Sequence, residues 1–245
     1  MKNWLNYFEH NRTHRAEIDW QKPIELAHAL RAPLIRSLQR FQVGESGEGN
    51  HLRSHAATTG DPAYQAAIEL FIKEEQEHAR LMACILQKQN APLLKMHWSD
   101  GCFILLRRLF GLRHELLVLL IPEMIAKRYF RALRDRFDDP ALKAVFSQIL
   151  HDEDGHLGFH VDFLQAALVS LSLPERALLR LVWRLVFRAA CLVVIVDHRT
   201  ILRAVGVSAT TFWWDCGLLF DEVAAAILSR APTPVSARFA RILPG

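Results

Sequence analysis

The chain contains two copies of a short pattern, a Glu followed three residues later by a His, and the surroundings of the pattern repeat with it. Glu75 and His78 form the first copy, and Glu153 and His156 form the second. On an α-helix, residues three apart share a face, so each pair points a carboxylate and an imidazole in the same direction. One such pair alone is typical of a solvated helix face. The repeat of its surroundings indicates that the two pairs belong to one functional site.

A shift of 78 residues superposes the two halves of this repeat. Each half has a Glu, an Asp-Pro dipeptide and the Glu-x-x-His pair in the same order, with Glu45 on Glu123 and Asp61-Pro62 on Asp139-Pro140. Asp caps the free amides of a helix start, and Pro fits the first turn. Each half is therefore predicted to be a helical hairpin whose two Glu residues lie about 20–24 Å from the turn, at one level.

Apolar residues with helical spacing flank each pair. The second predicted helix has the stripe Tyr64, Ile68, Phe71, Glu75, His78, Met82 and Ile85, and the fourth has Leu142, Phe146, Ile149, Glu153, His156, His160 and Phe163. Spacings of three and four residues mark a core-facing side. The acids are therefore expected inside, where several carboxylates together are costly unless they are paired or bind cations.

These residues resemble the ligand set of the ferritin-like di-iron carboxylate proteins, the group that includes rubrerythrins, bacterioferritins and di-iron oxygenases. The resemblance covers about residues 34–170. It implies an all-α fold, a four-helix bundle with one long crossover, which here is followed by two additional C-terminal helices. It also implies six metal ligands: Glu45, Glu75, His78, Glu123, Glu153 and His156.

The same resemblance implies that Glu75 and Glu153 bridge two metal ions, with one further Glu and one His on each metal. The expected cofactor is a pair of iron ions, with an iron–manganese pair as the alternative, because a mixed carboxylate and imidazole set suits both metals. Glu74 and Asp152, the acids that precede the bridging residues, would accept hydrogen bonds from the imidazoles. The alternative is that both are ordinary solvent-exposed acids.

Two residues break the symmetry of the repeat and leave alternatives open. Glu48 lies on the core stripe and forms a third Glu-x-x-His pair with His51, so a register with Glu48 in place of Glu45 is an alternative. His160 stands where the first half has Met82. It is either a third nitrogen ligand or proton donor, or a core histidine bonded to a backbone carbonyl. His51, His55 and His151 are interpreted as ordinary polar histidines.

The predicted organisation has four parts: an N-terminal segment (1–33), the di-metal bundle (34–171), a helical extension (172–231) and a tail (232–245). Within the first bundle helix, expected over 33–57 after a short helix at 23–32, three glycines (Gly44, Gly47 and Gly49) indicate either close helix packing or a locally loosened helix beside the metals. Residues 91–111 would form the crossover, and Pro122 would kink the third helix.

The predicted helix over 174–206 carries an arginine at every fourth position, from Arg176 to Arg188, among Leu, Val, Trp and Phe. Its uncharged run is too short to cross a bilayer. Three interpretations stay open for this helix: packing on the bundle, a homodimer interface, or contact with a membrane surface. A sixth helix is expected after Ser208.

Charge and cysteine content narrow the function classes. A formal charge of +4 with scattered basic residues does not indicate nucleic-acid binding. The chain starts without an apolar stretch and has four cysteines without a CxxC pair, so we expect a cytoplasmic protein without a rubredoxin-type carrier.

The function that the resemblance implies is a non-haem di-iron oxidoreductase or oxygenase, which uses O2, a small organic substrate and an external electron donor. The first alternative is a ferroxidase or peroxide-scavenging protein without an organic substrate. The second is a non-catalytic bundle whose site is structural.

Overall fold

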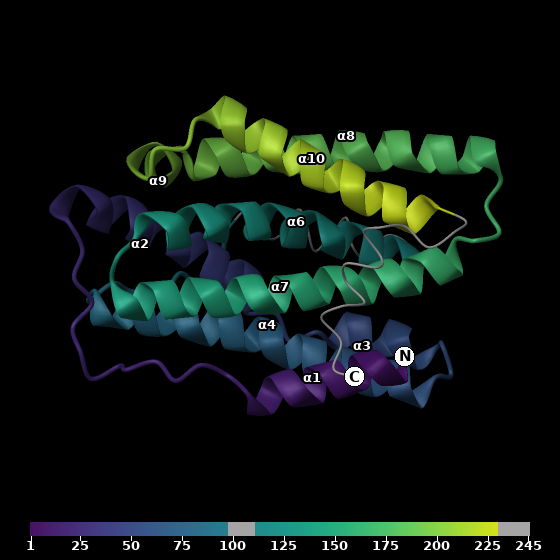
Figure 1. Cartoon of the computed structure of the whole chain (residues 1–245), viewed down its shortest axis with the longest axis horizontal. Coiled ribbons are helices and arrows are strands. Elements are labelled where there is room, and N and C mark those ends of the chain that lie inside the picture. The colour runs from purple at the N-terminus through teal and green to yellow at the C-terminus, as the bar shows by residue number, and fades with distance from the viewer. Residues whose placement is uncertain (98–110, 230–245) are drawn as a thin grey trace.

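The computed structural model describes residues 1–97 and 111–229, and all regular secondary structure in these two ranges is helical. Figure 1 shows the long helices running along the length of the molecule in stacked layers. Among the described residues, no helix is long and apolar enough to cross a membrane.

Four long helices form the centre: α2 (His28–Glu45), α4 (Pro62–Lys88), α6 (Leu112–Arg136) and α7 (Pro140–Ala167). Helix α2 packs against α4, α6 against α7, and α4 against α7. Both Asp-Pro helix starts form as predicted. The side chain of Asp61 accepts hydrogen bonds from the backbone N–H groups of Ala63 and Tyr64, and that of Asp139 accepts one from Leu142.

The first predicted helix is not continuous. Helix α2 begins at His28, within the short helix expected at 23–32, and continues to Glu45. A second helix, α3 (Asn50–Ala57), follows after a break of four residues. Gly49 has φ +71°, and a Cβ there would lie 2.6 Å from the side chain of Ile72. The glycines therefore end the helix at a predicted ligand, as the interpretation of a loosened helix anticipated.

An N-terminal helix, α1 (Lys2–Thr13), covers the open side of α4 and α7. Trp4, Tyr7 and Phe8 of this helix are all buried, and the sequence did not predict a helix in this segment. The ring of Tyr7 lies over Gly155, where an added Cβ would be 2.4 Å from it. Gly155 is therefore a close-packing glycine, and α7 continues through it.

Helices α8 (Leu173–Asp197), α9 (Arg199–Ala204) and α10 (Ala209–Leu228) form a further layer over α6 and α7, at the top of Figure 1. The helix expected over 174–206 is thus interrupted at His198, whose buried ring contacts Ser37 of α2 through Nδ1 at 2.5 Å. The helix expected after Ser208 is α10, and the Ser208 hydroxyl caps it.

The arginine stripe of α8 packs within the chain. Arg176 is buried and donates to the carbonyls of Leu168, Leu171 and neighbouring residues. Arg180 and Arg184 pair with a single acid of α10, Asp221, and Arg188 lies over the ring of Trp213, 4.4 Å from its centroid. Intramolecular packing is therefore the interpretation that the structure supports for the arginines.

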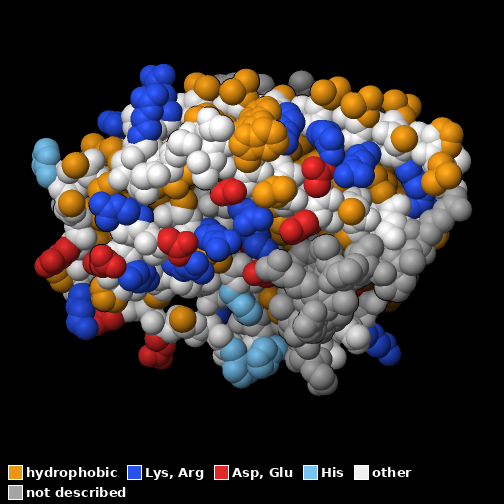
Figure 2. Space-filling model, turned by 45° about the horizontal axis from the view of Figure 1, so that its top comes forward, with side chains coloured by type: hydrophobic (Ala, Val, Ile, Leu, Met, Phe, Trp, Pro, Cys, Tyr) orange, Lys and Arg blue, Asp and Glu red, His pale blue; other side chains and the backbone are white. Residues whose placement is uncertain are grey.

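The opposite side of α8 is apolar and faces outward. Figure 2 shows hydrophobic side chains gathered along the upper edge of the molecule, and the exposed residues of α8 include Leu178, Leu181, Leu185, Leu192 and Val196. A homodimer or a membrane surface on this side stays a prediction. The crossover expected over 91–111 is non-helical to residue 97; its remainder and the tail expected over 232–245 lie outside the described residues.

The contact between Gly155 and Tyr7 yields a testable prediction. Gly155→Ala should lower the free energy of unfolding by about 1–3 kcal/mol, because the new methyl group overlaps the buried Tyr7 ring. Urea unfolding measures the effect. Gly44→Ala is the matched control, since no atom lies within 4 Å of its added Cβ and Ala is the better helix former. Equal stability of the two variants would contradict the close packing of α1.

Candidate metal centre

The six predicted ligands converge from all four central helices. Glu45 ends α2, Glu75 and His78 lie on α4, Glu123 on α6, and Glu153 and His156 on α7. Their potential ligand atoms form two groups, each with all atoms within 4.8 Å of one another: Glu45, Glu75 and His78 in one, and Glu75, Glu123, Glu153 and His156 in the other. Glu75 belongs to both groups, the position that a bridging carboxylate requires.

Individual distances show how the two groups join. His156 Nδ1 lies 3.1 Å from Glu75 Oε1 and 3.1 Å from Glu123 Oε2. His78 Nδ1 lies 3.6 Å from the same Glu75 oxygen and 4.0 Å from Glu153 Oε1. The carboxylates of Glu75 and Glu153 are therefore both between the two imidazoles, whose ring centroids are 5.6 Å apart.

Several of these buried atoms have no hydrogen-bond partner among the described residues. They are Glu75 Oε1, Glu153 Oε2 and His78 Nδ1. A buried polar atom without a partner is costly, and two acceptor oxygens together with an imidazole nitrogen are the donor types that iron and manganese bind. The residues present thus fit a pair of such ions.

The acids that precede the two predicted bridging residues, Glu74 and Asp152, are both buried. Each of these crossed acids contacts the histidine of the other half of the repeat. Glu74 Oε2 lies 3.0 Å from His156 Nε2, and Asp152 Oδ2 lies 2.9 Å from His78 Nε2. Each carboxylate therefore holds the imidazole of the other helix by its outer nitrogen and turns Nδ1 toward the centre, the arrangement that metal-binding histidines commonly show. Burial of both acids excludes the alternative that they are solvent-exposed.

Two residues of the N-terminal segment contact these acids in turn, and neither contact was predicted from the sequence. The Asn11 amide on α1 donates to Glu74 at 2.6 Å and to Asp152 at 2.7 Å, and Arg15 contacts the same two carboxylates at 3.2 and 2.7 Å. One amide and one guanidinium thus link the symmetry-related acids. Neither residue has a counterpart in the repeat, so the signal that revealed the six ligands could not reveal them.

The pKa values follow from crowding of acids in a dry core. Burial raises the pKa of Glu45 and Glu153 well above the usual value, and the adjacent Glu75 and Glu123 raise it further. Burial alone would raise the pKa of Glu75, but His156 and other neighbours lower it to about 2. Burial alone would lower the pKa of His156, but the surrounding carboxylates raise it well above its usual range. The metal-free centre therefore retains protons that a bound cation would displace.

The residues left open by the sequence are placed as follows. Glu48 lies in the break between α2 and α3, is exposed and accepts a hydrogen bond from Asn50, so it is apart from the two groups. His51 and His55 are partly exposed, and both contact the buried carboxylate of Glu115. His151 is exposed, as expected.

His160 is fully buried one turn beyond His156, with its ring 4.8 Å from that of Phe71. Neither of its ring nitrogens has a hydrogen-bond partner among the described residues, so the interpretation as a histidine bonded to a backbone carbonyl is wrong. Burial and the neighbouring His156 lower the pKa of its imidazole to about 3. His160 is therefore a neutral imidazole at physiological pH.

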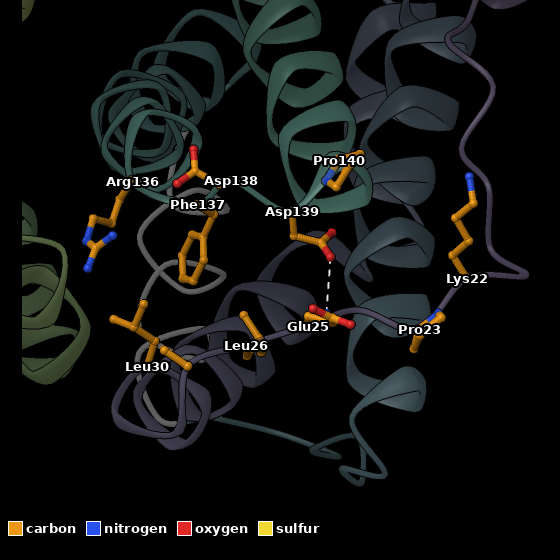
Figure 3. Close-up of a pocket in the computed structure, with 11 residues that line it drawn as sticks. Lys22, Pro23, Glu25, Leu26, Leu30, Arg136, Phe137, Asp138, Asp139 and Pro140 are labelled. Carbon is orange, nitrogen blue, oxygen red and sulfur yellow. Dashed lines mark hydrogen bonds between the residues drawn. The ribbon is translucent and has the colours of Figure 1, made fainter.

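A hollow among the described residues is remote from this centre. It has a volume of about 540 Å³ and lies at the α6–α7 turn, where Figure 3 shows Phe137, Asp139 and Leu30 around it and the Asp139 carboxylate bonded to the Glu25 backbone. Fourteen residues separate Asp139 from Glu153, a helical rise of about 21 Å. None of the six converging residues lines the hollow.

Comparison of the chain with models of protein families, with curated proteins and with solved structures found no match in any of the three. What the structure shows is an all-helical protein with buried groups of carboxylates and imidazoles at metal-binding distances.

The layer from α1 gives a prediction for the centre. Asn11→Ala should weaken binding of a divalent metal by about 10–100-fold, because the acids that orient both imidazoles lose a shared donor. It should also lower the free energy of unfolding by about 1–3 kcal/mol, since buried carboxylate oxygens lose a partner. Metal titration and urea unfolding test both effects. Asn3→Ala, an exposed change on the same helix, should leave both unchanged; equal metal affinity in the two variants would refute the role of Asn11.

The raised pKa values predict how stability of the metal-free protein depends on pH. Glu45, Glu153 and His156 all have raised pKa values in the folded chain, so in the pH window between their ordinary and their raised pKa values the unfolded chain releases protons that the folded chain still holds. Stability therefore falls as pH rises through this window, by at most about 1.4 kcal/mol per pH unit for each group. The lowered pKa values of Glu75 and Asp152 contribute stability that is lost only in acid, outside this window.

Urea unfolding of chelator-treated protein at pH 7 and at pH 8 measures this slope. Glu153→Gln should make the slope smaller, because it removes one of the titrating groups. Stability that stays constant or rises between pH 7 and 8 would show that the centre does not hold these protons.

Proposed function

We propose that the chain is a ferritin-like di-metal carboxylate protein and acts as a non-haem di-iron oxidoreductase that uses O2. The observation that carries the proposal is the pair of ligand groups joined through Glu75 at the level where the four central helices meet. The repeat of the hairpins, the Asp-Pro helix starts and the crossed acids all agree with the di-iron carboxylate arrangement. When bound, a pair of ferrous ions would supply the electrons that reduce O2.

In this proposal, Glu45 and His78 would hold one metal, Glu123 and His156 would hold the other, and Glu75 and Glu153 would be the carboxylates that the two metals share. The crossed acids Glu74 and Asp152 orient the imidazoles and balance part of the charge. The centre is closed on the side of α1 by Asn11 and Arg15. Glu45 and Glu75 are partly buried and lie beside the break after α2, and this is the side from which small molecules would reach the metals.

His160 is the residue that we assign to hydrogen bonding beside the metals. Its imidazole is neutral, fully buried and without a hydrogen-bond partner among the described residues. Its unprotonated ring nitrogen can therefore accept a hydrogen bond or bind a metal, and its N–H can donate a hydrogen bond. The counterpart in the first half is Met82, which can do neither. The difference between His160 and Met82 would give the two metals unlike surroundings. Unlike surroundings favour oxidation of an organic substrate over metal storage.

A second function, oxidation of iron or removal of peroxide without an organic substrate, is favoured by one observation. Four hollows among the described residues are each lined by none of the six ligands and not by His160, and a centre apart from these hollows suits reactants as small as O2, peroxide or a ferrous ion. O2 uptake distinguishes the two functions. An oxygenase with a suitable external donor consumes O2 beyond the single oxidation of its own metals, and a ferroxidase consumes it in proportion to added ferrous iron.

Metal content tests the ligand set shared by both functions. Full-length protein loaded with ferrous iron without oxygen should hold two ions at the centre, and Glu75→Ala should abolish two-ion occupancy because the shared carboxylate is lost. Glu153→Ala should act in the same way. Glu48→Gln is the matched control and should keep both ions, since Glu48 lies outside the groups. Undiminished iron in both alanine variants, measured by elemental analysis, would refute the ligand set.

A further inference from the structure

A second group of metal-binding side chains lies apart from the central one. His51 and His55 are one turn apart on α3, and Glu115 is in the first turn of α6. Their potential ligand atoms lie within 4.8 Å of one another, and none of the three residues belongs to either central group. We propose that these residues form a mononuclear site for a Zn²⁺-class ion, which fastens α3 to α6. The proposal is independent of the function assigned to the central site.

The geometry is close to that of a coordination sphere. His51 Nδ1 lies 3.0 Å from Glu115 Oε1, and His55 Nδ1 lies 2.7 Å from Oε2 of the same carboxylate. Two ligand atoms about 2.0–2.1 Å from a zinc ion at a tetrahedral angle are about 3.3 Å apart. The ligand atoms of the three side chains therefore need to move apart by only a few tenths of an ångström to make room for the ion.

Burial and charge favour a cation at this place. The carboxylate of Glu115 is fully buried, whereas the side chains of the two histidines are 28 % and 23 % exposed. A buried carboxylate needs a cation or strong hydrogen bonds. The partly exposed histidines leave an entry path and a coordination position for water, and two imidazoles with one carboxylate form a ligand set that zinc commonly binds.

Tyr64, at the start of α4, is fully buried, and its hydroxyl has no hydrogen-bond partner among the described residues. Burial raises the pKa of this hydroxyl, and the charge of Glu115 raises it further.

The position in the fold indicates what a bound ion would do. Helix α3 has eight residues and follows the break that ends α2 at Glu45. Helices this short are unstable alone, so α3 depends on its contacts with α4 and α6. An ion held by α3 and α6 would fix the end of the segment that begins at the central site. The structure therefore assigns a stabilising role to the second site.

The alternative is a cluster held only by hydrogen bonds, in which each imidazole donates its Nδ1 proton to Glu115. The replacement His51→Asn/His55→Asn separates the two cases. An asparagine amide places an N–H donor near the position of Nδ1, so a hydrogen-bonded cluster survives, but the imidazole ligands are lost. His10→Asn/His14→Asn is the matched control, because these histidines are also four residues apart, at the C-terminal end of α1, and stack at 3.9 Å, with His14 Nδ1 facing a backbone carbonyl.

The experiment titrates Zn²⁺ into chelator-treated full-length protein without a histidine tag and counts bound zinc after gel filtration. The control variant should bind as many equivalents as the unchanged protein, and His51→Asn/His55→Asn should bind one fewer. Zinc should also slow amide hydrogen exchange in residues 50–57 of the control by at least tenfold, but not in that variant. Equal zinc content in the variant and the unchanged protein would overturn the proposal, and so would unchanged exchange in α3.

If the asparagine variant does not fold, Glu115→Gln provides the same comparison with a buried amide that accepts a hydrogen bond but carries no charge. It should also bind one equivalent fewer. A loss of iron from the central site in Glu75→Ala, with the zinc equivalent of this second site retained, would show that the two sites are separate. Loss of the zinc equivalent in Glu75→Ala would overturn the second site.

Discussion

The structure depends on the burial of ionisable side chains between α4 and α7. Glu74, His78, Asp152, Glu153 and His156 are all at most 4 % exposed, in a region where an unpaired charge is costly. Polar partners offset this cost. An imidazole contacts each of the acids Glu74 and Asp152, and an amide and a guanidinium from the N-terminal segment contact the same two acids. Glu75 Oε1, Glu153 Oε2 and His78 Nδ1 still lack hydrogen-bond partners among the described residues, and all three residues belong to the groups that could hold a metal ion.

The same constraint explains the arrangement of the outer helices. Helix α1 seals the buried acids with Asn11, and Gly155 allows it to approach α7 closely enough to do so. The break between α2 and α3 places Glu45 at a helix end beside the partly buried Glu75. The centre is therefore closed on one side by packed aromatic and amide groups, and bordered on the other by these two partly buried carboxylates.

The sequence predicted the two hairpins and the convergence of the six ligand side chains. It could do so because both features depend on local sequence patterns that occur in each half of the repeat. Asp-Pro fixes a helix start, and residues spaced by three and four fix a face. The crossed acids were expected near the imidazoles for the same reason. Which acid meets which imidazole was not predicted, because it depends on how α4 and α7 pack against each other.

Tertiary structure alone decided the rest, and the physical reason is the same in each case. The contacts of Asn11 with Glu74 and Asp152 span 63 and 141 residues, and those of His51 and His55 with Glu115 span 64 and 60. No periodicity within one helix can encode such contacts. The sequence by itself determined which faces turn inward and at what level the ligands lie. Packing between helices determined which polar groups meet there, and which remain free to bind a metal.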